Sequence, residues 1–175
     1  MNHDRYSDDY IREVLSLVKT VAVVGASPNT VRPSYFVLKY MLSKGYDAVA
    51  INPGHAGREI GGAMTYASLA DAPRAIDMVD IFRNSQAAGG VVDEALALDP
   101  LPKVIWMQLG VRNDEAARKA EAAGVRVVMN RCPKIEYARL AGEIGWAGVS
   151  SGVISSRKPE MSKGFQRYGL DKKPG

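Results

Sequence analysis

The sequence predicts one α/β domain built on a doubly wound, parallel, five-stranded sheet. Short apolar runs alternate along the chain with segments whose apolar residues recur at helical spacing, which is typical of successive β-α-β units. The apolar runs are almost free of polar residues, as strands covered on both faces must be. A chain of 175 residues, 46% hydrophobic and 24% charged, suits a single globular domain. We expect the strand order 3-2-1-4-5 with right-handed crossovers.

The first half of the chain is expected to hold two helices and two strands. Ser7 caps an opening helix, and a second helix begins near Pro33, because proline is tolerated in a first turn. Gly45 ends that second helix. Its buried stripe is expected to comprise Phe36, Val37, Tyr40 and Met41. Strands are expected at 21–24 and 48–51, followed by a glycine-rich loop with only short pieces at 64–67 and 68–72.

The second half continues the alternation with three strands and three helices. Strands are expected at 78–82, 104–107 and 125–129. Helices are expected to begin near Ser85 and after the Asn113 cap, with a short one at 135–140. In a sheet of this kind the ligand lies outside the carboxyl ends of the strands, at the switch point beside strand one. That rule selects five loops: 25–32, 52–55, 82–84, 108–110 and 130–132.

The first of these loops has the features of an anion site. Gly25 allows a sharp turn, and the free N–H groups of a helix N-terminus attract negative charge. Ser27, Asn29 and Thr30 offer hydrogen-bond donors, and Arg32 offers a bidentate clamp for phosphate. A phosphorylated ligand is favoured, although this loop alone is also compatible with an ordinary turn that binds nothing.

Two common nucleotide motifs are absent. A dinucleotide fingerprint requires three spaced glycines and an acid at the end of the second strand, whereas this loop has one glycine and the second strand ends at Asn52. Both departures count against NAD. No Gly-Lys-Ser/Thr follows, so the loop is not a Walker A motif.

Five motifs that occur in order extend the pattern beyond the first loop. They are Gly25-Ala26-Ser27-Pro28 with Arg32-Pro33-Ser34, Val49 to Gly54, Asp80-Ile81-Phe82-Arg83, Trp106 to Gly110, and Asn130 to Lys134. Together they resemble the family of small stand-alone CoA-binding proteins, which is similar to the N-terminal CoA-binding domain of the succinyl-CoA ligase alpha subunit. The resemblance covers roughly 8–154. It implies a Rossmann-like domain that binds coenzyme A across the switch point.

The resemblance also implies where the ligand would lie. The phosphate and ribose part of CoA would meet Gly25, Ala26, Ser27, Asn29 and Arg32. The nucleotide would be bordered by Asn52, Pro53 and His55, the last standing where the ligase domain has a lysine. The remaining walls and floor would be formed by Phe82, Arg83, Gln108, Gly110, Asn130 and Cys132. The phosphohistidine domain of the ligase has no counterpart here, so the ligase activity does not transfer.

The charge near the second strand agrees with CoA. The ribose of CoA carries a 3′-phosphate, which an acid at the end of that strand would repel. Asn52 is neutral, and Arg32, His55 and Arg58 are near it in the sequence.

Several residues allow two interpretations. Cys132 either meets the CoA thiol, forming a mixed disulfide on oxidation, or packs a turn as a buried cysteine. His55 either contacts phosphate or is simply exposed, and Arg32 and Arg83 are either ligand contacts or surface charges. Trp106 is expected in the core. Asp77 and Asp80 flank a strand without a basic partner, and no catalytic triad, carboxylate pair or activated nucleophile is evident.

Three functions follow as hypotheses. The first is a CoA-binding carrier, sensor or accessory protein without chemistry of its own. The second is an NAD(P)-dependent or acyl-CoA-dependent enzyme that uses the same pocket. The third is an interaction module whose segment 150–175 docks a partner or a second copy, which includes a homodimer.

Composition bounds the remaining properties. The net charge of +4 comes from 157–175, which holds six basic and two acidic residues. We expect a CoA-binding domain at 1–154 and a basic extension at 155–175, with nucleic acid not expected as a partner. One cysteine and two histidines make a zinc site improbable. The polar N-terminus and the lack of a long apolar run predict a cytoplasmic protein without membrane contact.

Overall fold

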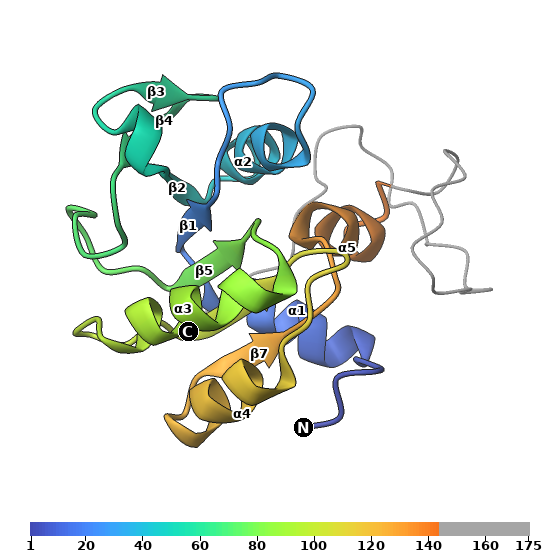
Figure 1. Cartoon of the computed structure of the whole chain (residues 1–175). Coiled ribbons are helices and arrows are strands. Elements are labelled where there is room, and N and C mark those ends of the chain that lie inside the picture. The colour runs from blue at the N-terminus through green and yellow to red at the C-terminus, as the bar shows by residue number, and fades with distance from the viewer. Residues whose placement is uncertain (144–175) are drawn as a thin grey trace.

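A seven-stranded sheet forms the centre of the computed structural model, which describes residues 1–143 (Figure 1). All five predicted strands form: β1 (Thr20–Val24), β2 (Asp47–Ile51), β5 (Met78–Ile81), β6 (Val104–Met107) and β7 (Arg126–Val128). Two further strands, β3 (Glu59–Ile60) and β4 (Ala63–Tyr66), lie at one edge. The order is β3-β4-β2-β1-β5-β6-β7, and each neighbouring pair is parallel except β3 and β4. The predicted α/β doubly wound class is confirmed.

The predicted strand count and the order 3-2-1-4-5 are corrected. β5 pairs with β1, not with β2, and the place beside β2 is taken by β4. With β4 counted as the third strand, the six parallel strands have the order 3-2-1-4-5-6. β4 was expected only as a short loop piece because it is not an apolar run. Thr65 is buried within it and Met64 is half exposed, so it has the alternating pattern of a strand near an edge.

This correction moves the switch point. The chain leaves β1 toward β2 and β4, then returns to the other side of β1 to begin β5. The strands on which the direction reverses are therefore β1 and β5. As a result, the loop after β5 lies directly beside the loop after β1.

Helices cover both faces of the sheet (Figure 1). One face packs against α1 (Asp8–Leu17), α2 (Pro33–Ser43) and α5 (Pro133–Leu140). The other packs against α3 (Ser85–Leu96) and α4 (Asp114–Ala122). Alternate residues of each strand enter the two cores, so Val23 belongs to the first and Val24 to the second. This two-sided burial is the reason that the central strands are almost wholly apolar.

The predicted helix signals are confirmed at most ends. The predicted caps Ser7 and Asn113 each accept a hydrogen bond from a backbone N–H in the first turn of α1 and α4, and Asn84, which was not predicted as a cap, does the same for α3. The stripe expected on α2 needs one correction, because Phe36 is 49% exposed and Leu38 is fully buried in its place. Trp106 is fully buried, as expected, and its Nε1–H donates to the Arg131 carbonyl at 2.8 Å.

The basic extension predicted at 155–175 and the docking segment 150–175 lie outside the described residues. Between residues 1 and 143, no helix has the length and apolar character needed to cross a membrane.

Candidate functional site

The backbones of two loops touch at the switch point. Gly25 follows β1 with φ of +85°, and its N–H donates to the Ile51 carbonyl at 3.0 Å. A Cβ atom at this position would lie 2.6 Å from the Phe82 carbonyl oxygen and 3.4 Å from Cδ of Arg83. Both the angle and the space therefore require glycine. Gly25 thus brings the first loop against the loop after β5.

The first loop is held by its own side chains. The Ser34 hydroxyl accepts from the Ser27 N–H at 3.2 Å, and the Ser27 hydroxyl accepts from the Asn29 N–H at 3.2 Å. The Asn29 carbonyl side-chain oxygen accepts from the Val31 N–H at 3.1 Å. Arg32 occupies the N-cap position of α2 but gives no side-chain cap. The hydroxyl hydrogen of Ser27 and the amide hydrogens of Asn29 remain available as donors to a ligand.

Asn52 joins the first loop to the second. Its Nδ2 donates to the Ala26 carbonyl at 2.7 Å, and its Oδ1 accepts from the Gly54 N–H at 2.9 Å. The residue thereby caps the short 3₁₀ helix η1 (Pro53–His55), in which His55 is half-buried. The side-chain amide of Asn52 thus holds the first two loops together, and its contact with a nucleotide stays a prediction.

Asn130 fixes the loop after β6 in a similar way. It adopts a left-handed conformation with φ of +53°, and its Oδ1 accepts from the Gly110 N–H at 2.8 Å. From the other side, the Ser85 hydroxyl accepts from the Arg112 N–H at 3.0 Å. Asparagine tolerates the left-handed region better than most residues. The loop 108–113 is therefore held from both α3 and the end of β7.

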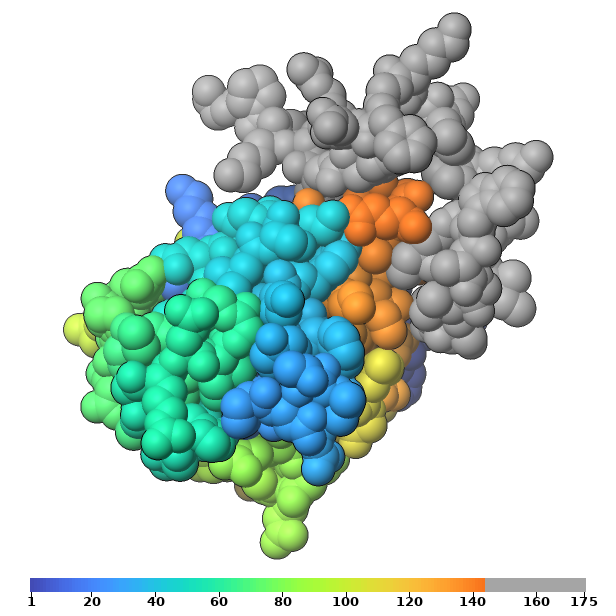
Figure 2. Space-filling model, turned by 90° about the horizontal axis from the view of Figure 1, so that it is seen from above, coloured from blue at the N-terminus to red at the C-terminus, as the bar shows by residue number. Residues whose placement is uncertain are grey.

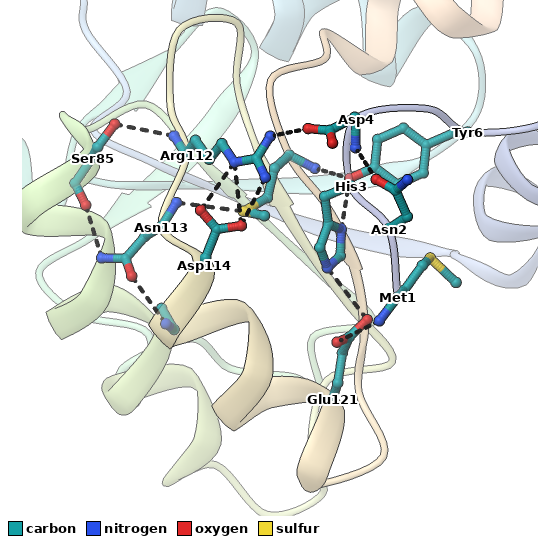
Figure 3. A network of polar contacts seen from close by, with 12 residues as sticks. Met1, Asn2, His3, Asp4, Tyr6, Ser85, Arg112, Asn113, Asp114 and Glu121 are labelled. Carbon is teal, nitrogen blue, oxygen red and sulfur yellow. Dashed lines mark hydrogen bonds and ion pairs between the residues drawn. The ribbon is translucent and has the colours of Figure 1, made fainter.

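The N-terminal segment extends this support (Figure 3). The Arg112 guanidinium pairs with Asp4 at 2.6 Å and with Asp114 at 2.9 Å. The Tyr6 hydroxyl accepts from the Met129 N–H at 2.7 Å, and His3 Nδ1 lies 2.9 Å from the same hydroxyl. Residues 1–6 thus tie the ends of β6 and β7 together on the side away from β1.

Positive charge gathers on the loops at this edge. The loops 25–32, 52–58, 82–84, 108–110 and 130–134 contain no acidic residue. Their cationic residues are Arg32, Arg58, Arg83, Arg131 and Lys134, with His55 in addition. Within residues 1–143, Arg32 and Arg83 take part in no ion pair, whereas Arg131 approaches Glu136 at 3.8 Å. Figure 2 shows the blue first loop at the surface, between the teal second loop with β3 and β4 and the orange α5.

Apolar surface and a groove adjoin these cations. Val31 is 73%, Phe36 49% and Leu109 57% exposed. The Lys134 ammonium lies 5.7 Å from the centre of the Phe36 ring. A groove of about 480 Å³ begins at Pro28 and is lined further by α2 and the turn between β3 and β4. The edge therefore carries both cationic and exposed apolar side chains.

A buried acid lies beneath the loops. Asp80 of β5 is fully buried, and Gln108 Nε2 donates to its Oδ1 at 2.8 Å and its Oδ2 at 3.1 Å. Burial raises the pKa of Asp80 to about 8, although the hydrogen bond from Gln108 acts in the opposite direction. The carboxyl group is therefore mostly protonated at neutral pH. Asp80 lies within its strand and not at its flank, which corrects the expectation.

Cys132 is buried at the N-cap position of α5. Burial raises the pKa of its thiol to about 11, while the N–H of Ile135 has the opposite effect. Thiol–disulfide exchange requires the thiolate, so this environment suppresses the reaction. The interpretation of Cys132 as a packing residue gains support, and the mixed disulfide with CoA stays a prediction.

The structure brings the sequence-predicted residues to one edge of the sheet. All belong to the loops after β1, β2, β5, β6 and β7 or to the ends of those strands: Gly25, Ala26, Ser27, Asn29, Arg32, Asn52, Pro53, His55, Phe82, Arg83, Gln108, Gly110, Asn130 and Cys132. Ala26 is fully buried and lies within the first core, so only its backbone is available. Sequence reasoning missed Ser34, Ser85 and the role of Asp80. An acid inside an otherwise apolar strand was the available signal for Asp80.

The sequence of this chain is similar to a known family and to a bacterial protein. The profile of a family described as "CoA binding domain" matches residues 19–138. An uncharacterized protein from Bacillus subtilis, YneT, is 36% identical over 128 residues, which are 73% of this chain and 92% of that protein.

Two solved structures extend the comparison. A hypothetical protein from Pyrococcus horikoshii is 38% identical, with a TM-score of 0.74, over 81% of this chain and 97% of that one. An acetyl-coenzyme A synthetase from Ca. Korarchaeum cryptofilum, solved with phosphate and ADP, is 26% identical with a TM-score of 0.58. This match covers 68% of the present chain but only 27% of the synthetase.

The contact at Gly25 predicts a large loss of stability for Gly25→Ala. Gly45 has nearly the same angle, φ of +84° against +85°, but nothing lies within 4 Å of a Cβ there. Gly45→Ala therefore measures the backbone strain alone. We expect Gly25→Ala to lose about 1–3 kcal/mol more than Gly45→Ala in urea unfolding, because a side chain is forced against a carbonyl. Equal losses would show that the close approach is unimportant.

The buried acid predicts that stability falls as the pH rises. Unfolded Asp80 ionises near its ordinary pKa of 3.8, whereas the folded protein holds the proton until about pH 8. The contribution of Asp80 to the free energy of unfolding is thus fully present below pH 3.8. It is lost as the pH rises toward 8, by up to about 1.4 kcal/mol per pH unit. Asp80→Asn should remove this slope, so its advantage over the wild type should grow from pH 5 to pH 8.

Asp77→Asn is the matched control for that experiment. Burial alone would raise the pKa of Asp77, but Lys103 and the N–H groups of Lys19 and Thr20 together lower it below its ordinary value. Asp77 is therefore ionised in both states across this pH range. Unfolding free energies that run parallel for the wild type and Asp80→Asn would contradict a buried neutral acid.

The environment of Cys132 predicts slow modification of the native thiol. A pKa of about 11 against an ordinary 9.0 reduces the thiolate fraction about 100-fold at neutral pH. We expect a disulfide reagent such as DTNB to react at least that much more slowly with the folded protein than with the protein in urea. A native rate equal to the unfolded one, or a CoA adduct that disappears in Cys132→Ser, would instead favour the mixed-disulfide hypothesis.

Proposed function

The chain belongs to the CoA binding domain family, and we propose that it binds coenzyme A, or a CoA derivative, at the carboxyl edge of its sheet. The observation that carries this proposal is the charge of that edge. Five loops without an acid meet at the carboxyl edge around the switch point, where open α/β sheets bind ligands, and four of the five contain cationic residues. CoA is a polyanion with a pyrophosphate and a 3′-phosphate, and it matches this charge.

Particular residues suit the phosphates. Arg32 ends the loop that begins at Gly25, Arg83 adjoins Gly25 directly, and within residues 1–143 neither forms an ion pair with an acid. A guanidinium can hold a phosphate through two parallel hydrogen bonds. The amide hydrogens of Asn29 and the hydroxyl of Ser27 add donors on the first loop, and His55 lies on the second. We assign the phosphate contacts to these groups.

The amphipathic surface suits the rest of the ligand. CoA carries a pantetheine arm whose methyl groups and amides require an apolar surface with a few polar groups. Val31, Phe36 and Leu109 supply exposed apolar surface at the same edge. The likeness to part of an acetyl-coenzyme A synthetase agrees with a CoA ligand, although this chain corresponds to about a quarter of that enzyme.

We propose a carrier, sensor or accessory role, not catalysis. The two titratable groups under the loops, Asp80 and Cys132, are both held in their neutral forms by burial. The Asp80 carboxyl group is fully buried against Gln108, and the reactive thiolate form of Cys132 is suppressed, which speaks against a general base or a nucleophile in contact with the ligand. The amides of Asn52 and Asn130 are used to hold loops. These features support binding without a reaction.

Calorimetric titration with CoA, dephospho-CoA and NAD tests the proposal. We expect micromolar binding of CoA, weaker binding of dephospho-CoA, and little binding of NAD. Arg32→Ala should weaken CoA binding about tenfold or more, because a hydrogen bond to a charged group is lost. Arg74→Ala is the control, since Arg74 pairs with Asp47 at the amino end of β2 and should leave the affinity unchanged.

The other outcomes are equally informative. Binding of NAD without CoA would replace the proposal by an oxidoreductase. Equal affinity for CoA and dephospho-CoA would show that the 3′-phosphate is not read. No heat with any of the three ligands would overturn the proposal.

A further inference from the structure

A buried acid and a buried amide meet where β5 and β6 end. Asp80 is fully buried and Gln108 is 5% exposed. Gln108 Nε2 lies 2.8 Å from one carboxyl oxygen of Asp80 and 3.1 Å from the other. A single amide nitrogen thus serves both oxygens. This arrangement is the one that an ionised carboxylate favours, because both oxygens then accept.

The other end of the Gln108 amide has no partner. Across residues 1–143, no hydrogen bond reaches Gln108 Oε1. The fully buried polar side-chain atoms that lack a partner in this range belong to His3, Thr65 and Arg126, and Oε1 is not among them. Oε1 therefore contacts solvent-accessible space. Because Gln108 follows β6 at the carboxyl edge, this space is the proposed ligand site.

Protonation of Asp80 changes what Gln108 can offer. A carboxylic acid and a primary amide form a cyclic pair, in which the acid O–H donates to Oε1 and one Nε2–H donates to the acid carbonyl. In this pair Oε1 is occupied, and one N–H remains free. When Asp80 is ionised, Nε2 donates to the carboxylate with both oxygens in reach, and Oε1 is free. The same side chain therefore presents a donor in one state and an acceptor in the other.

The groups that face Asp80 do not titrate in the pH range in which Asp80 ionises. Its register neighbours are Val23 on β1 and Trp106 on β6, neither of which titrates in this range. From the start of α5, Cys132 faces it, and the charge of Asp80 contributes to the raised pKa of that thiol. Lys134, further along α5, lowers the pKa of Cys132. Cys132 is itself neutral below about pH 11 and does not compete.

We propose that Asp80 is a positioning residue whose ionisation frees Gln108 Oε1 to accept a hydrogen bond from an N–H group of the ligand. This inference rests on the proposed function, since the ligand is CoA. CoA carries N–H donors of one chemical kind at two places, in the amides of the pantetheine arm and in the amino group of adenine. Ligand affinity should therefore rise as Asp80 loses its proton.

Calorimetry between pH 6.5 and 9 measures this coupling. We expect CoA to bind the wild type about two- to tenfold more tightly at the upper end, which corresponds to one ordinary hydrogen bond. Asp80→Asn should remove that part of the pH dependence, while Asp77→Asn should keep it. The titration of the ligand's own phosphate and thiol is common to all variants and cancels in the comparison.

Gln108→Met separates positioning from a structural role. This variant keeps the buried acid, so the fall of stability with rising pH should persist, but the pH dependence of affinity should disappear. Persistence of both would overturn the proposal. Repeating the series with 3′,5′-ADP locates the donor, because this fragment retains adenine and lacks the pantetheine amides.

A measurement without ligand keeps this inference distinct from the proposed function. The side-chain amide signals of Gln108 in ¹⁵N NMR spectra should titrate with a midpoint near 8 in the wild type and stay fixed in Asp80→Asn. If CoA does not bind but the Gln108 signals titrate, the proposal that CoA is the ligand is overturned and the proposed Asp80–Gln108 switch is retained. Signals that do not move between pH 6.5 and 9 would overturn the switch whatever the ligand.

Discussion

The contact between Gly25 and the Phe82 carbonyl fixes the geometry of the carboxyl edge. Gly25 follows β1 and Phe82 follows β5. These two strands are neighbours, and the chain leaves them toward opposite edges of the sheet, so their loops form the switch point. A Cβ at Gly25 would be 2.6 Å from that carbonyl oxygen, and the loops could not lie together. The place of the Arg83 side chain beside the first loop depends on this approach.

A second constraint is that three amide side chains each connect two segments of this edge. Asn52 joins the first loop to the second, and Asn130 joins the last loop to the one after β6. Gln108 joins the end of β6 to Asp80 on β5. An amide has both donors and acceptors and carries no charge, so it can connect backbone or carboxyl groups without changing the potential of the edge. Among the charged side chains of these loops, Arg32 and Arg83 form no ion pair within residues 1–143.

The buried acid sets the third feature of the site. Asp80 lies in β5 beneath loops that contain no acidic residue, and burial keeps it mostly protonated at neutral pH. A carboxylate in the same place would reduce the positive potential above it, whereas the neutral acid does not. The proposed phosphate contacts at the surface are therefore separate from the Asp80–Gln108 pair beneath them. Cys132 shares the same dry environment and is neutral for the same reason.

The sequence by itself determined the class of fold, the five main strands, the helix caps and the loops that meet at the ligand edge. These depend on local signals: apolar runs, cap residues and glycines have the same meaning wherever they occur. The pattern of five motifs also identified the family that the comparison later showed. The positive charge of this edge also follows from the sequence, because the five loops contain no acidic residue.

Only the tertiary structure decided the rest. The place of β4 beside β2 could not be read from a short segment with an exposed Met64, since strand pairing is a non-local choice. The roles of Asn52 and Asn130 as clamps depend on partners that lie 26 and 20 residues away along the chain. In the sequence Asp80 is an acid without a basic partner, and its burial within β5 makes it a mostly neutral acid bound to Gln108. For these residues, the side-chain type determines which hydrogen bonds and charges are possible. Which of these form depends on the residues that the fold brings next to them.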